Sequence, residues 1–163
     1  MKRIVLLTGA RGVGKTTVCC RTVERAWAAG WDCAGLLTLT VDQERRDVLD
    51  VRGGCWCRLT TAGAGVRQGR YTFDAAVLAW GARTLVQAVP CDLLVVDELG
   101  PLEVERGEGW AVAFDVLAGG LFRLALVVVR LELLELVRGR LPAAQVVTVT
   151  RENRDGLPAG LLY

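Results

Sequence analysis

Hydrophobic positions along the chain form short continuous runs that alternate with stretches of helical spacing. The runs predict buried strands at Arg3–Leu7, Cys33–Val41, Cys91–Val96, Leu124–Val129 and Gln145–Val149. The stretches between them predict helices at Lys15–Ala29, Phe73–Val89, Gly109–Leu117, Leu131–Arg138 and Asn153–Leu162. Strands that alternate with helices in this way predict an α/β fold with a mainly parallel central sheet and flanking helices.

One stretch of the chain departs from this alternation. Apolar positions on both sides of Arg52-Gly53-Gly54, from Val48 to Leu59, predict an inserted β-hairpin with a glycine turn. The glycine-rich, basic segment Ala62–Arg70 then predicts a mobile loop. No repeat, low-complexity segment or linker is visible, so we expect a single nucleotide-binding domain over residues 1–163.

Composition and charge narrow the classes of partner. The chain has 163 residues, 52% of them apolar, and a net charge of +2, which gives no reason to expect nucleic acid as a partner. The longest apolar run, Leu124–Val129, is far shorter than the ~20 residues that span a bilayer, and the N-terminus does not resemble a signal peptide. We therefore expect a cytoplasmic monomer without a membrane partner.

The six cysteines and the absence of histidine limit the chemistry further. Without histidine, Ser-His and Cys-His nucleophilic catalysis is excluded. The cysteine spacing fits neither a zinc site nor the disulfide framework of a secreted protein. We expect the cysteines to be small buried apolar residues: Cys19, Cys20, Cys33, Cys55, Cys57 and Cys91.

A phosphate-binding loop follows the first predicted strand. The segment fits G-x-x-x-x-G-K-[ST] in full, between a strand and a helix, as Gly9-Ala10-Arg11-Gly12-Val13-Gly14-Lys15-Thr16. Glycines let backbone N–H groups turn inward around a phosphate, and the following helix directs its positive end at the same group. We expect Lys15 to reach the β- and γ-phosphates, Thr16 to ligate Mg²⁺, and Thr17 to cap the α-phosphate side.

Two adjacent carboxylates end the third predicted strand. The carboxyl edge of the sheet faces the nucleotide in phosphate-loop proteins, so Asp97 is expected to hold Mg²⁺ and Glu98 to act as general base toward water. The alternative is a pair of solvated acids at a strand end. Glu103, a few residues further on, is either a second polar contact or a surface acid.

A strand order of 5-1-4-3-2, counted over the five predicted parallel strands, places further polar residues at the same edge. Arg130 follows the fourth strand and would point toward the γ-phosphate as a catalytic, charge-stabilising residue, or else is a surface arginine at a helix start. After the fifth strand, Asn153, Arg154 and Asp155 either contact base or ribose or cap the final helix. In the basic loop, three residues either close over the phosphates or stay solvated: Arg67, Arg70 and Tyr71.

Four segments in order resemble the thermophile-type nucleoside-triphosphatase family, to which the human cancer-related nucleoside triphosphatase is related. They are Gly9–Thr17, Gly69–Asp74, Val96–Glu103 and Asn153–Asp155, and the resemblance extends over nearly the whole chain. It implies a RecA-like phosphate-loop fold and a slow, Mg²⁺-dependent hydrolase that releases phosphate from ATP, GTP and other triphosphates with loose base selectivity. It also supports the roles expected for Lys15, Thr16, Asp97 and Glu98.

The sequence leaves other functions open beside hydrolysis. A small-molecule or nucleotide kinase would use the same cradle, although a glutamate beside the metal-binding aspartate favours water as the nucleophile. A non-catalytic, nucleotide-dependent switch is the other alternative. A nucleic-acid motor is the least favoured, because the chain has no basic tract.

Overall fold

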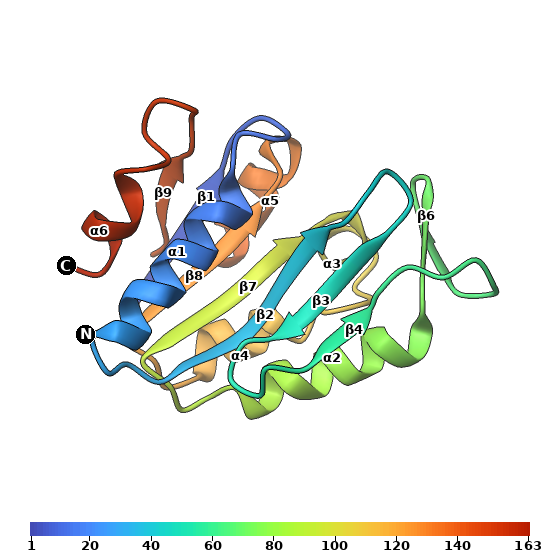
Figure 1. The fold of residues 1–163 in the computed structure, drawn as a ribbon, viewed down its shortest axis with the longest axis horizontal. Helices are drawn as coiled ribbons and strands as arrows, with labels where there is room; N and C mark the ends of the chain where they lie inside the picture. The colour runs from blue at the N-terminus through green and yellow to red at the C-terminus, as the bar shows by residue number, and fades with distance from the viewer.

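A seven-stranded sheet forms the centre of the protein, with helices on both faces (Figure 1). The computed structural model describes residues 1–163. The strands lie in the order β4-β3-β2-β7-β8-β1-β9, with the bounds β1 Arg3–Thr8, β2 Cys33–Thr40, β3 Arg46–Asp50, β4 Trp56–Arg58, β7 Leu93–Leu99, β8 Leu124–Val129 and β9 Gln145–Thr148. The five parallel strands have the predicted order 5-1-4-3-2, which confirms the mainly parallel α/β sheet.

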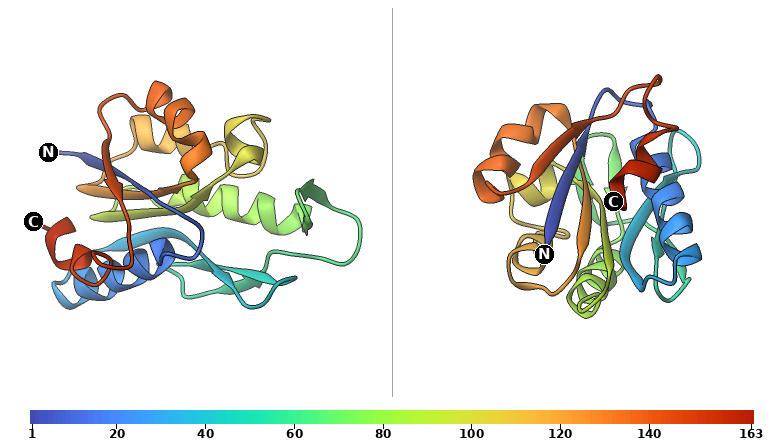
Figure 2. Two further views of the ribbon diagram at one scale, coloured as in Figure 1. Left: turned by 90° about the horizontal axis from the view of Figure 1, so that it is seen from above. Right: turned by 90° about the vertical axis from the view of Figure 1, so that its left-hand side faces the viewer.

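The helices form two layers, one on each face of the sheet (Figure 2). One face is covered by α1 (Lys15–Ala28) and α6 (Leu157–Leu161). The other face is covered by α2 (Ala75–Gln87), α3 (Pro101–Val104), α4 (Ala113–Gly119) and α5 (Leu134–Arg140), which continues a 3-10 turn at Leu131–Leu133. Two separate clusters of 17 and 25 buried residues fill the two interfaces, and this burial is the main favourable term that holds the layers together.

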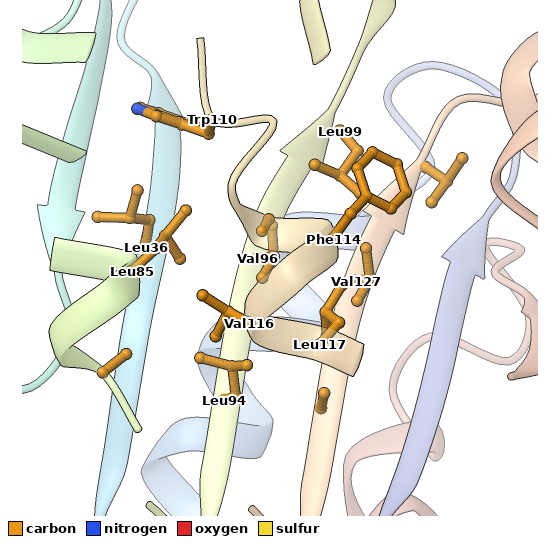
Figure 3. Packing of buried hydrophobic residues seen from close by; sticks show 14 of the residues in the cluster. Leu36, Leu85, Leu94, Val96, Leu99, Trp110, Phe114, Val116, Leu117 and Val127 are labelled. Atoms are coloured by element: carbon orange, nitrogen blue, oxygen red, sulfur yellow. The ribbon is translucent and has the colours of Figure 1, made fainter. Parts of the chain in front are cut away.

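The central strands are apolar on both faces because both faces are covered. All six residues of β8 are buried. Figure 3 shows the larger cluster, in which Leu85 of α2 and Phe114 and Leu117 of α4 lie over the sheet. The Trp110 indole donates a hydrogen bond to the carbonyl oxygen of Leu78 (3.1 Å).

Two β-hairpins extend the fold beyond the parallel core. The predicted hairpin is present as β3 and β4, and it continues the sheet beyond β2, with β3 antiparallel to β2 and β4 antiparallel to β3. The prediction of a mobile loop at Ala62–Arg70 is wrong in part, because β5 (Val66–Gln68) pairs with β6 (Tyr71–Phe73) in a second, two-stranded sheet that projects from the core (Figure 1). Gly69, with φ of +59°, makes the turn between them.

Several helix boundaries differ from the prediction for local reasons. α2 begins at Ala75 because the Asp74 carboxylate accepts the N–H groups of Ala76 and Val77 and so caps the helix. α4 does not begin at Gly109, where φ is +58° and the backbone cannot be α-helical. α6 is confined to residues 157–161, and the short helix α3 was not predicted.

The cysteines are all free thiols, and they differ in burial. Cys19 and Cys33 are buried as expected, and three others are only partly buried: Cys20, Cys57 and Cys91. The expectation of a buried residue is wrong for Cys55, which is exposed in the turn before β4. None of the helices is both long enough and apolar enough to cross a bilayer.

Candidate nucleotide site

A cleft of about 520 Å³ opens at the carboxyl ends of β1, β7 and β8. Most of the phosphate loop lines it, and Glu98, Arg130 and Arg46 face it from other elements. The lining residues of the loop and of the start of α1 are Gly9, Ala10, Arg11, Gly12, Gly14, Lys15, Thr16 and Thr17, whereas Val13 packs against the smaller core cluster.

Two glycines of the loop are required by its shape. Gly9 has a φ of +147°, and a Cβ there would lie 2.5 Å from the carbonyl oxygen of Val149. Gly14 has a φ of +106°, and a Cβ there would lie 2.9 Å from Cδ of Arg154. The loop therefore wraps closely against β9 and the tail that follows it, and the helix α1 begins directly behind it at Lys15.

The Lys15 side chain folds back over the loop. Its Nζ donates hydrogen bonds to the carbonyl oxygens of Gly9 (2.8 Å) and Ala10 (3.1 Å). Burial lowers the pKa of Lys15, while the nearby carboxylates of Glu98 and Asp97 act to raise it. The ammonium group is thus held at the mouth of the loop, where phosphate oxygens would replace the two carbonyl oxygens.

The structure brings Thr16 and Asp97 together across 81 positions of sequence. The Thr16 hydroxyl donates to Oδ2 of Asp97 (2.9 Å), and the backbone N–H of Thr38 donates to the same oxygen (3.2 Å). Asp97 is 1% exposed, and its Oδ1 has no hydrogen-bond partner. A buried carboxylate oxygen that lacks a partner, beside a threonine hydroxyl, is the kind of donor set that fits Mg²⁺.

Burial also changes the protonation of Asp97. The pKa of Asp97 is raised to about 6, mainly by removal from water and in addition by the neighbouring charge of Glu98, while the hydrogen bonds from Thr16 and Thr38 oppose the shift. A divalent cation bound here would lower this pKa and stabilise the ionised carboxylate, because its positive charge would replace the stabilisation that water gives an exposed carboxylate.

Glu98 is displaced from the strand ladder into the cleft. The register between β7 and β8 shifts between Asp97 and Leu99, so Glu98 has no partner residue in β8, and the peptide bond between Asp97 and Glu98 is cis. The Nε of Arg130 donates to Oε1 of Glu98, and a guanidinium nitrogen of Arg46 lies 3.6 Å from Oε2. Two arginines, one at the start of β3 and one directly after β8, therefore hold this carboxylate.

Sequence reasoning missed Arg46. It starts β3, its side chain is 14% exposed, and its Nε is buried without a hydrogen-bond partner. Its guanidinium carbon also lies 5.6 Å from the centre of the Tyr71 ring. No local pattern marks it, because Arg45-Arg46-Asp47 resembles a charged turn and only the pairing of β3 with β2 brings Arg46 to the cleft.

The tail after β9 lies against the loop and does not line the cleft. The Asn153 side chain accepts the N–H of Thr150 and donates to the carbonyl oxygen of Thr148, so it shapes this turn. Arg154 lies over Gly14 and donates to the carbonyl oxygen of Val13 (3.3 Å). Asp155 forms an ion pair with Arg21 of α1. The contact of Asn153 and Arg154 with the nucleoside stays a prediction.

The remaining candidates divide between the cleft and the framework. Arg70 and Tyr71 line the cleft, whereas Arg67 does not. Glu103 is 5% exposed and accepts the backbone N–H groups of Gly100 (2.9 Å) and Trp110 (3.3 Å). It therefore fixes the turn after β7, which rules out a surface acid.

A family model and similar known proteins both assign this chain to the same family. A family model described as NTPase matches residues 4–162. The nucleoside-triphosphatase THEP1 of Thermofilum pendens is 33% identical over 96% of this chain and 91% of its own length, and that of Methanosarcina barkeri is 30% identical over 94% and 92%. The crystal structure of THEP1 from Aquifex aeolicus has the same fold, with a TM-score of 0.70 and 18% identity over 96% of this chain and 95% of that one. This chain therefore belongs to the NTPase family of nucleoside triphosphatases.

Proposed function

We propose that the protein is a Mg²⁺-dependent hydrolase that cleaves the terminal phosphoanhydride bond of ATP, GTP and other nucleoside triphosphates, with little selection of the base. The observation that carries the proposal is the hydrogen bond between Thr16 and Asp97, with Glu98 next in the chain and facing the same cleft. A cation-binding pair, a phosphate loop and a carboxylate that can accept a proton thus converge on one point.

Binding would rest on the loop and Lys15. The backbone N–H groups of residues 9–16 and the N-terminal end of α1 attract the phosphates, and Lys15 exchanges its two carbonyl acceptors for oxygens of the β- and γ-phosphates. A bound Mg²⁺ on Thr16 and Asp97 would neutralise charge on the phosphate oxygens.

Hydrolysis would begin with an exchange of partners at Glu98. In the structure its carboxylate is held by Arg130 and Arg46. The γ-phosphate, with its larger negative charge, draws both guanidinium groups to itself, and Glu98 is then free to accept a proton from the attacking water. The water oxygen bonds to the γ-phosphorus, the bond from that phosphorus to the bridging oxygen breaks, and the diphosphate leaves.

Loose base selectivity follows from where the polar side chains lie. The charged residues of the cleft gather around the phosphate positions: Arg11, Lys15, Arg46, Arg70, Glu98, Arg130 and Glu132. The amide group of Asn153, which has the chemistry to recognise a base, is used within its own turn. Without such contacts, the binding energy comes mainly from groups that all triphosphates share.

The test is phosphate release from ATP, GTP, CTP and UTP with Mg²⁺ and no added acceptor, compared between the wild type, Glu98→Gln and Glu132→Gln. Glu132 is a matched control, because it is a second carboxylate of the same cleft without an ion-pair partner. We expect the four triphosphates to be hydrolysed at similar rates, and Glu98→Gln to slow turnover by about 100-fold or more with nucleotide binding retained.

Three results would contradict parts of this proposal. Wild-type turnover in Glu98→Gln would exclude Glu98 as the base. Phosphate transfer only when an acceptor is supplied would identify a kinase. Tight nucleotide binding with no phosphate release from the wild type would identify a nucleotide-dependent switch.

A further inference from the structure

A second cleft, of about 490 Å³, lies beside the nucleotide cleft. Ten residues line it, and five are arginines: Arg11, Arg67, Arg70, Arg106 and Arg130. None of the ten is a carboxylate. Arg11, Arg70 and Arg130 also line the nucleotide cleft, so the two clefts are neighbours at the end where the γ-phosphate is expected.

Three of the five arginines in this second cleft form no ion pair with a carboxylate of the protein. No carboxylate lies within ion-pair distance of Arg11, Arg67 or Arg70, whereas Arg106 pairs with Glu108 and Arg130 with Glu98. Arg70 donates to the Tyr71 hydroxyl (3.0 Å), and Arg67 has only a long contact with the carbonyl oxygen of Gly69 (3.4 Å). Like charges gathered at one place destabilise the folded state unless an anion joins them.

The walls of the second cleft are fixed by contacts between distant segments. The backbone N–H of Leu102 donates to Oε1 of Gln68 (2.9 Å), and Arg106 donates to the carbonyl oxygen of Arg67 (2.7 Å). These two bonds fasten the β5–β6 hairpin to α3 and the turn after it. The arginines are therefore carried on a tethered framework, with Pro101 and Leu102 as an apolar wall.

We propose that this second cleft binds a phosphate group, as inorganic phosphate or as part of a small phosphorylated molecule, next to the γ-phosphate of the nucleotide. Guanidinium groups bind phosphate oxygens in bidentate fashion, and several together match the double negative charge of a phosphate better than the single charge of a carboxylate. The volume is that of a small-molecule site. The position of the site relative to the γ-phosphate rests on the function proposed above, whereas the site itself does not.

The test is calorimetric titration of inorganic phosphate into protein saturated with Mg²⁺ and a non-hydrolysable ATP analogue, which blocks the phosphate loop. We expect one further phosphate to bind, and Arg67→Gln and Arg106→Ala to weaken it by about tenfold or more, as for loss of a charge-assisted hydrogen bond. Arg67→Gln keeps the backbone carbonyl that Arg106 uses. Arg138→Ala is the control, because this arginine lies on α5 outside both clefts and pairs with Glu135.

The outcomes separate this inference from the proposed hydrolysis. In Lys15→Ala, measured without nucleotide, phosphate should still bind, and adding Arg67→Gln should weaken that binding. This result would support the second cleft even if the wild type hydrolysed nothing. Absence of phosphate binding, or equal binding in both cleft variants and the wild type, would overturn the proposal. Displacement of phosphate by a short single-stranded oligonucleotide with a steep salt dependence would also overturn it in favour of a nucleic-acid surface.

A comparison of two probes identifies the source of the phosphate. Tighter binding of glycerol 3-phosphate than of inorganic phosphate supports a phosphorylated ligand whose organic part contacts Leu102. Equal or weaker binding supports the phosphate that hydrolysis releases.

Discussion

The phosphate loop and the arginine face of this protein lie at two neighbouring clefts but arise in different ways. The phosphate loop is eight consecutive residues, Gly9–Thr16, whose shape depends on its own glycines and on the strand and helix beside it. The arginine face comes from five places in the chain: Arg46, Arg67, Arg70, Arg106 and Arg130. The groups proposed to bind phosphate are thus contiguous in sequence, whereas the groups proposed to act on the terminal phosphate are brought together by the topology.

This difference has a physical consequence for mutation. A change in the loop would act on groups that are proposed to touch the nucleotide directly, and we expect the rest of the fold to compensate little for it. A change in the arginine face acts through ion pairs and tethers that are shared among several elements, so its effects are expected to be smaller and coupled.

The largest effect is expected for Lys15→Ala. This variant loses two charge-assisted hydrogen bonds to phosphate oxygens, so triphosphate affinity should fall by about 1,000-fold. Isothermal titration with a non-hydrolysable analogue measures it. The chain has one other lysine, Lys2, whose variant Lys2→Ala should bind as the wild type does because it lies outside both clefts. Unchanged affinity in Lys15→Ala would remove the loop from its proposed role.

The next largest effect is expected at the two arginines that hold Glu98. Arg130→Ala and Arg46→Ala should each lower kcat by about 100-fold, as for loss of one donor that stabilises transition-state charge, with a smaller change in nucleotide affinity. Single-turnover phosphate release measures the chemical step, and Arg138→Ala serves as the control. The fold-loss of kcat in the double variant should be smaller than the product of the two single fold-losses, because both arginines share Glu98. A fold-loss equal to that product would show that the two arginines act independently.

The same contrast explains how much the sequence alone predicts. Gly9–Thr16 and Asp97-Glu98 are recognisable because each is contiguous and follows an apolar strand. The alternation of strands and helices predicts the parallel sheet, whereas the order 5-1-4-3-2 was assumed and agrees with the structure. The place of Arg130 followed from that strand order. Arg46 was missed because its position depends on antiparallel pairing beyond β2, which no local signal specifies.

The tail and the second hairpin show a different limit of sequence reasoning. Asn153 has the chemistry of a base-recognising residue, yet its amide closes a turn, and sequence does not distinguish these two uses. Residues 62–70 have the composition of a loop, and the β5–β6 hairpin forms there because Gln68 and Arg67 find partners near α3. Both outcomes depend on contacts between segments that are far apart in sequence.

A moderate effect on thermal stability is expected for Asp97→Asn, and its size depends on pH. Burial raises the pKa of Asp97 to about 6 from its ordinary 3.8. Between these two pH values Asp97 is ionised in the unfolded chain but still protonated in the folded protein. The free energy of unfolding therefore falls by about 2 kcal/mol as pH rises from about 4 to about 6. Without ligands, Asp97→Asn should therefore melt several degrees higher than the wild type at pH 8 and at a similar temperature at pH 4.

Asp97→Asn is expected to raise stability but to weaken the binding of Mg²⁺-nucleotide. Because Mg²⁺ requires the ionised carboxylate, Mg²⁺-nucleotide affinity of the wild type should fall as pH decreases through about 6, and Asp97→Asn should bind weakly at every pH. A wild type that melts higher than Asp97→Asn at pH 8 would contradict the assigned burial cost. Calorimetric melting and nucleotide titration over pH 4–8 measure the two halves of this prediction.

The smallest effect is expected for Gln68→Ala, and it tests whether the arginine face depends on its tethers. The variant removes the hydrogen bond from the Leu102 amide to Gln68, which joins the β5–β6 hairpin to α3, and leaves all the arginines in place. Loss of one neutral hydrogen bond, worth about 1 kcal/mol, should weaken phosphate binding in the second cleft by about fivefold. Hydrogen exchange at Leu102 should accelerate at the same time, because this amide loses its acceptor.

Nucleotide affinity decides what the Gln68→Ala result means. Gln68 does not line the nucleotide cleft, and its side-chain hydrogen bond is to Leu102, so nucleotide affinity should stay at the wild-type value. The control Gln87→Ala, at the exposed end of α2, should change the binding of neither ligand. A parallel loss of nucleotide and phosphate affinity would show that the two clefts behave as one site. Loss of phosphate affinity alone would show that tertiary contacts set the arginine face while the phosphate loop keeps its shape without them.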